Sequence, residues 1–271
     1  MGLFSPGFLK EGKGINKDDP EKNRFFLFFE LFFGHFSKLV TVNFVYFITM
    51  LPLFFGIMLS INFSQWPFKF TGDIVGMILI VVSIFTSFPM TAGFTFVIRN
   101  MQRREHAWII RDMFKHAKAN YKKAAINGAV QLVVYFLMYV AYITYRYNIG
   151  GTTGFMLSWI IVMISIIFIW MQYYMNLMIV TFDLTLKQIY KNALIFAIAK
   201  LPANLLITVI CIALIFLCMW YVPTVINVLL LAVIYLSLLG FITIYGIYPS
   251  VDKVMITNAD TSEEDSSVGD V

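Results

Sequence analysis

The sequence predicts an all-α integral membrane protein with six transmembrane helices, and three observations lead to this fold class. First, 60% of the 271 residues are hydrophobic and 13% are charged, whereas soluble domains are about half apolar and about a quarter charged. Second, the apolar residues gather in six segments, each long enough to cross a hydrocarbon core of about 30 Å. Third, lysine and arginine concentrate in every second flank between these segments. We therefore expect one membrane domain at residues 39–250 with short polar ends.

Each predicted span contains about 20 or more predominantly apolar residues, the length that a transmembrane helix needs. The last two spans almost touch, forming an apolar run of 47 residues from Leu201 to Ile247. A single helix of that length would be more than twice as long as the bilayer is thick, so we expect a tight turn around Tyr221-Val222-Pro223. The predicted spans are Leu39–Ile61, Ile74–Ile98, Ala125–Thr144, Phe155–Val180, Leu201–Val222 and Pro223–Ile247.

The distribution of basic residues predicts the orientation. The N-terminal flank, the segments after the second and fourth spans and the C-terminal tail together carry eighteen lysines and arginines, and the other flanks carry two. Because basic flanks stay in the cytoplasm, both termini are predicted to be cytoplasmic. The segment after the second span has the most basic residues: Arg99, Arg103, Arg104, Arg111, Lys115, Lys118, Lys122 and Lys123.

The two ends of the chain differ in character. Residues 1–23 are polar and lack an apolar stretch with a cleavage site, so they are predicted to be a cytoplasmic N-terminus without a cleavable signal peptide. Residues 24–38 place seven phenylalanines within an arc of roughly 160° at helical spacing. This predicts a helix in the inner membrane interface; the alternative is an N-terminal extension of the first span. Residues 251–271 are small, polar and acidic, and are predicted to be disordered.

Two amphipathic cytoplasmic helices are predicted, at Ala107–Ala124 and Thr185–Ala199. Thr185 with Gln188 three residues later is typical of a capping box. Both helices follow an even-numbered span and lead into an odd-numbered one, and residues 114–117 match residues 190–193. The pattern suggests an internal repeat of span, amphipathic helix and span, although two cytoplasmic helices can also resemble each other by chance.

One face of the first amphipathic helix is basic. Its members are spaced by four, three and four residues, and each such charge near an anionic leaflet contributes about 1 kcal/mol. We expect this face to contact anionic lipid head groups or the acidic surface of a protein partner; the alternative is that these charges only set the topology. The candidate contact residues are Arg111, Lys115, Lys118 and Lys122.

Polar residues inside the predicted spans are neutral amides, which typically hydrogen-bond between helices. Acidic residues of the kind used in proton relays or ion coupling do not occur mid-span. Pro52 and Pro89 are candidate helix kinks, because each removes a backbone donor; they are either gating hinges or fixed bends. Met90–Gly93, directly after Pro89, is small enough for close helix approach. The amides are Asn43, Gln131, Gln172, Asn176, Asn204 and Asn227.

No motif in the sequence predicts catalysis, a cofactor or a metal ion. The three histidines are scattered without metal-ligand spacing, and the sequence contains no HExxH, GxSxG, P-loop or GxGxxG pattern. Cys211 and Cys218 are seven residues apart on one helix, too far to form a disulfide. The excess of basic residues lies between spans, which favours anionic head groups over nucleic acid as its partner.

Four stretches resemble the YesL-like family of bacterial multi-pass membrane proteins, a family of unknown function, and the resemblance as a whole spans roughly residues 25–250. The resemblance implies a bacterial plasma-membrane protein with an accessory role near carbohydrate uptake, because family members are often encoded beside sugar ABC transporters. The family has no agreed active site, so the resemblance assigns no functional residue. The matching stretches are TVNFVYFITMLPLFFG, SFPMTAGFTFVIRNMQRRE, IIRDMFKHAKANYKKAAINGAV and MIVTFDLTLKQIYKNALIFAI.

The sequence therefore favours a non-enzymatic accessory or regulatory membrane protein, with ABC transporter subunits or a second copy of the chain as partners. The main alternative is a small transporter or channel, which Pro52, Pro89 and the repeat would suit. A membrane-embedded enzyme is the third reading.

Overall fold

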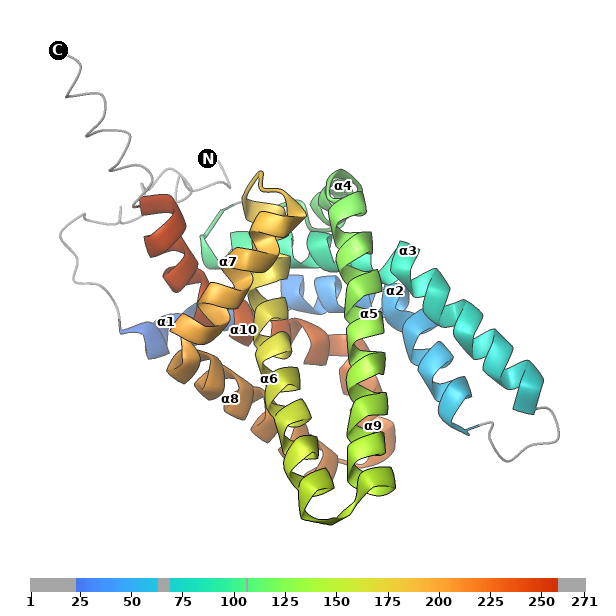
Figure 1. Ribbon diagram of the computed structural model, residues 1–271. Coiled ribbons are helices and arrows are strands. Elements are labelled where there is room, and N and C mark those ends of the chain that lie inside the picture. Colours follow the sequence, from blue (N-terminus) through green and yellow to red (C-terminus); the bar gives the residue numbers. More distant parts are fainter. Residues whose placement is uncertain (1–22, 63–68, 106, 258–271) are drawn as a thin grey trace, which may run out of the picture.

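The computed structural model describes residues 23–62, 69–105 and 107–257 (Figure 1). Within these ranges the chain is helical and contains no strand, which confirms the all-α fold class. The predicted polar N-terminus, apart from Asn23, and the tail beyond Thr257 lie outside the described residues. The elements are α1 (Arg24–Gly34), α2 (Phe36–Asn62), α3 (Lys69–Gln102), α4 (Ile109–Ala119), α5 (Tyr121–Ile143), η3 (Thr144–Ile149), α6 (Gly151–Thr181), α7 (Leu186–Ala199), α8 (Leu201–Tyr221), α9 (Thr224–Leu230), η4 (Leu231–Tyr235), α10 (Leu236–Val251) and η5 (Asp252–Thr257).

Six helices of the described ranges are long and apolar enough to cross a membrane, as predicted. The protein is therefore a multi-pass membrane protein. The predicted turn before Pro223 is confirmed, because α8 ends at Tyr221 and the next span begins at Thr224. The side-chain amide of Asn227 donates to the carbonyl oxygens of Cys218 and Val222, at 3.0 and 2.8 Å, and so satisfies two carbonyls exposed by the turn.

The spans form two visible hairpins, α2–α3 and α5–α6, which diverge from each other toward the lower part of the view (Figure 1). Gly56 on α2 and Gly76 on α3 face each other so closely that a Cβ on either would press against the backbone of the opposite helix. Small residues at such contacts allow helix backbones to approach in a membrane, where packing drives association.

Fully buried side chains concentrate at one end of the bundle. They come from the first residues of α2 and α8, the last residues of α3, α6 and α10, and the start of α5. We call this the basic end, defined by α1, α4, α7 and the C-terminal half of α10. The opposite end, the loop end, holds the connections η3–Gly150 and Val222–Pro223, and its helices are largely exposed. The core therefore sits at the basic end.

The second amphipathic helix agrees closely with its prediction, and the first does not. Thr185 caps α7, and its side chain and backbone N–H both pair with Gln188, which confirms the capping box. The first helix, predicted as one unit over Ala107–Ala124, ends at Ala119. Asn120 breaks it, and its side-chain amide donates to the carbonyl of His116. α5 then begins at Tyr121 and enters the membrane.

The helix at residues 24–38 is interrupted at His35, whose backbone N–H bonds to the carbonyl oxygens of Leu31 and Phe33. α1 is thus separate from α2 rather than a continuous extension of the first span. Phe28 packs on Phe241 and Tyr245 of α10, with ring centroids 5.4 and 5.3 Å apart. At the other end of the chain, the tail predicted to be disordered from residue 251 remains helical through Thr257.

Candidate functional site at the basic end of the bundle

The four flanks predicted to be cytoplasmic come together at the basic end. Arg104, after α3, donates to the carboxylate of Glu30 on α1 at 3.2 Å. Lys123, in the first turn of α5, pairs with Asp183, after α6, at the same distance. Arg24 at the start of α1 donates to the carbonyl oxygen of Tyr245 in α10 at 3.1 Å. These contacts place the described parts of the four basic flanks on one side of the membrane domain, as the charge alternation requires.

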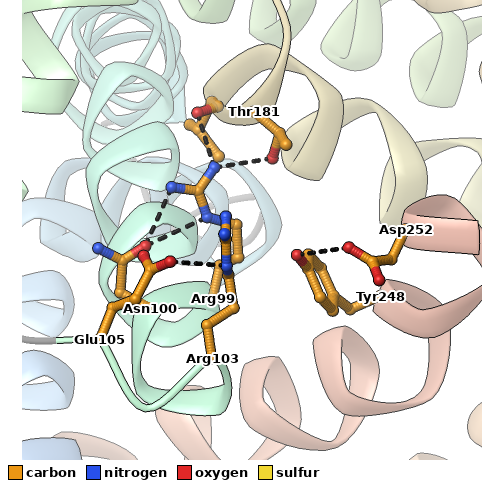
Figure 2. A network of polar contacts seen from close by, with 8 residues as sticks. Arg99, Asn100, Arg103, Glu105, Thr181, Tyr248 and Asp252 are labelled. Atoms are coloured by element: carbon orange, nitrogen blue, oxygen red, sulfur yellow. Dashed lines mark hydrogen bonds and ion pairs between the residues drawn. The ribbon is translucent and has the colours of Figure 1, made fainter. Parts of the chain in front are cut away.

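Arg99 lies at the centre of this end, between α3 and α6 (Figure 2). Sequence analysis placed it in the loop after the second span, but α3 continues to Gln102 and buries the side chain to 7% exposure. Its Nη1 donates to the carbonyl oxygen of Val180 and to the hydroxyl of Thr181, each at 3.0 Å. Its Nε and Nη2 donate to Oδ1 of Asn100.

The acceptors around Arg99 explain how a buried cation is tolerated there. Val180 and Thr181 form the last turn of α6, where unpaired carbonyls and the helix dipole favour a positive charge. The nearby acids are engaged elsewhere: Glu105 pairs with Arg103 at 2.8 Å, and Asp252 accepts from Tyr248 at 3.0 Å (Figure 2). Arg99 therefore caps the end of α6 and ties α3 to it, which is a structural role.

A ring stack joins α4 to the same place. The imidazole of His116 lies parallel to the ring of Phe96, with centroids 3.3 Å apart, and the guanidinium of Arg99 lies 4.8 Å from the centroid of Phe96. Burial lowers the pKa of His116, and the positive charges of Lys115 and Arg99 lower this pKa further against the opposing effect of Asp112. The ring is thus held neutral within the stack.

The bundle-facing side of α4 is fixed by close packing. Met113 and Ala117 are buried against α3, and a Cβ on Gly93 would collide with the carbonyl oxygen of Met113. This bears out the expectation that residues 90–93 allow close helix approach. Ile110 and Phe114, next around the helix, are about half exposed. They continue the apolar stripe outward, where a helix at the membrane surface would meet lipid.

The basic face of α4 lies beside this exposed apolar strip of Ile110 and Phe114. Arg111, Lys115 and Lys118 are exposed on α4, and within the described part of the chain they form no hydrogen bond or ion pair. Lys122 is also exposed but lies on α5, because the helix breaks at Asn120. The four predicted contact residues therefore belong to two helices, three of them sharing one face.

The intramembrane amides act mainly as links between helices. Asn43 of α2 donates to the carbonyl oxygen of Leu231 and accepts from the backbone N–H of Ser237. Asn127 of α5 donates to Gln172 of α6 and accepts from the hydroxyl of Tyr190 on α7. Asn176 is half-buried on α6 and forms no hydrogen bond among the described residues. Gln131 is half-buried on α5.

The two predicted kink residues lie within helices that continue through them. Pro52 is half-buried in α2 and Pro89 is buried in α3. The hydroxyl of Ser87, two residues before Pro89, donates to the carbonyl oxygen of Thr49, which links the proline-containing parts of the two helices. The structure thus brings the two prolines to one helix pair.

Several residues at this end have no sequence signal of their own. Arg99 reads as one loop cation among eight, and Phe96 and His116 belong to different predicted elements, so only the fold brings them together. Comparison with known protein families, with curated proteins and with solved structures found no match for the chain.

Proposed function

We propose that this multi-pass membrane protein is a non-enzymatic accessory or regulatory subunit of a transport system, which docks through the basic face of α4. The observation that carries the proposal is the exposure of Arg111, Lys115 and Lys118 on a helix that is itself locked to the bundle. A rigid surface of unpaired cations suits electrostatic recognition of an acidic partner or anionic head groups. The likeness to the YesL-like family, carried by the sequence stretches quoted above, supports a bacterial plasma membrane and a carbohydrate-uptake system as the setting.

The hydrogen bonding of the intramembrane amides favours this function over a transporter. Asn43, Asn127 and Gln172 use their polar atoms on neighbouring helices. Groups that a polar solute would need are then occupied in holding the bundle together. The placement of Pro52 and Pro89 in helices that stay unbroken is in keeping with a fixed scaffold.

Affinity purification in mild detergent from the native host tests the proposal, with Arg111→Gln/Lys115→Gln as the docking variant. The matched control is Lys187→Gln/Lys191→Gln, which removes two exposed charges from α7 at the same end. We expect stoichiometric co-purification of transporter subunits with the wild type and the control, and a loss of several-fold with the docking variant.

Two results would contradict the proposal. If the transporter subunits co-purify equally with the docking variant and the control variant, α4 is not the docking surface. If the protein purifies as a homogeneous preparation without partners and alone moves solute into liposomes, it is instead a transporter.

A further inference from the structure

An apolar groove lies between α1, α8 and α10, apart from the basic face of α4. Its volume is about 670 Å³, within the range of about 300–1,000 Å³ that is common for small-molecule sites. Phe28 and Phe32 line the side formed by α1, and Leu206 and Ile210 line the side formed by α8. Among its described lining residues, Arg24 is the one charged side chain.

Phenylalanines of α1 form one side of the groove, and two of their rings contact α10. Phe28 and Phe32 pack against the ring of Phe241 of α10, tilted and edge-on, at centroid distances of 5.4 and 5.9 Å. Phe25, Phe29 and Phe33 also line the groove, and each remains exposed on the described surface. The opening is therefore apolar, and it lies along helices that face lipid in a membrane protein. Acyl chains are the ligands that such a groove would bind.

Arg24 supplies a polar end to this apolar space. It donates one hydrogen bond to the carbonyl oxygen of Tyr245, and its guanidinium lies 5.4 Å from the ring centroid of Tyr245. It forms no ion pair with any carboxylate in the described ranges, although Glu30 lies on the same helix. A guanidinium has five N–H donors, so further donors can bind a phosphate with charge-assisted hydrogen bonds.

We propose that the groove binds one anionic phospholipid from the leaflet at the basic end. One acyl chain lies between the phenylalanines of α1 and the leucine and isoleucine of α8, and the phosphate contacts Arg24. The complementarity of a single cation with an otherwise apolar lining selects a lipid with a negative head group over a neutral lipid. An apolar helix in the groove would leave Arg24 without a counter-charge.

Native mass spectrometry of the delipidated, detergent-solubilised protein tests this site, with phosphatidylglycerol and phosphatidylcholine as probes. Leu206→Trp fills the groove, and Leu205→Trp is its control, because Leu205 is similarly exposed on α8 but does not line the groove. Arg24→Gln removes the head-group contact, and Arg146→Gln removes one exposed charge at the loop end as its control.

We expect the wild type and both controls to retain one phosphatidylglycerol in preference to phosphatidylcholine. Leu206→Trp should lose the bound lipid, whereas Arg24→Gln should bind both lipids with the preference reduced about fivefold, the ratio given by about 1 kcal/mol for one charge near the head groups. The Arg24→Gln arm remains decisive even if the tryptophan variant folds poorly, which size-exclusion chromatography would reveal.

Three outcomes would overturn the proposal. One is unchanged lipid retention by a folded Leu206→Trp variant, and another is equal binding of the two lipids by the wild type. The third is a change in oligomeric state, or loss of a co-purifying polypeptide, with Leu206→Trp and no change in bound lipid. That result would assign the groove to a protein interface.

Discussion

The hydroxyl of Tyr174 on α6 donates a hydrogen bond of 2.7 Å to Oδ1 of Asn204 in the first turn of α8. Both residues are fully buried. The amide nitrogen of Asn204 donates in turn to the carbonyl oxygens of Ala197 and Phe196 in the last turn of α7, at 3.0 and 3.4 Å. One asparagine thus joins three successive helices and fixes the angle at which α7 gives way to α8.

Asn204→Ala should therefore destabilise the bundle by about 1–3 kcal/mol, because it removes the partner of the buried Tyr174 hydroxyl and of the Ala197 carbonyl. Tyr174→Phe removes one bond and should cost less. Thermal unfolding in detergent would measure both, with exposed Tyr221→Phe as a control. In the double variant the two effects should be less than additive. Full additivity would mean that the two side chains do not interact.

Gly93→Ala should detach α4 from α3, since the added methyl group would collide with the backbone of Met113. Backbone cannot move aside as a side chain does, so we expect a loss of about 1–3 kcal/mol, the usual cost of overpacking. Gly34→Ala is the matched control, because a Cβ there meets nothing within 4 Å. Equal melting temperatures for the two variants would show that the contact is looser than described.

Acidification should loosen α4. The folded structure lowers the pKa of His116, chiefly by burial, so the released ring binds a proton more readily than the docked one. The docked neutral ring stabilises the packing of α4. This stabilisation is fully present above about pH 6.5, the ordinary pKa of histidine, and it is lost as the pH falls from there toward the lowered pKa of the docked ring.

Hydrogen exchange of the α4 amides at pH 7.5 and pH 5 would measure this effect after correction for the intrinsic rates. We expect faster exchange at the lower pH in the wild type, and little change in His116→Asn. If His116→Asn responds to pH as the wild type does, another group is responsible and the role of His116 is refuted.

The predicted orientation can be tested by cysteine labelling after replacement of Cys211 and Cys218 by serine. Asn148→Cys and Thr224→Cys lie exposed at the loop end and should react with a membrane-impermeant reagent in intact cells. Ala119→Cys, exposed at the last residue of α4, should react only after permeabilisation. The opposite pattern would reverse the orientation and contradict the charge rule for this protein.

The number of spans was predictable because apolar length alone determines it. The packing at the basic end was not predictable, because it depends on which helix ends meet. Counting charges assigns Arg99 to a loop, and no local pattern shows that the carbonyl end of α6 lies beside it. The break at Asn120 was also missed, since the helical spacing of apolar residues continues through it. An asparagine is a recognised helix-ending residue, but the deciding factor is the burial of Ala124 and Asn127 on α5, which turns the chain into the bilayer.

The uneven distribution of the core has a mechanical consequence. The hairpins α2–α3 and α5–α6 share the buried, hydrogen-bonded core at the basic end and diverge away from it (Figure 1). They can thus pivot about this common base, where Arg99 ties α3 of one hairpin to α6 of the other. A thinner bilayer, or a foreign helix wedged between the hairpins, would change their spread at a small cost because few buried contacts resist it. The buried core at the basic end would stay rigid, so a change in the tilt of the hairpins would reach α4, which packs on that core.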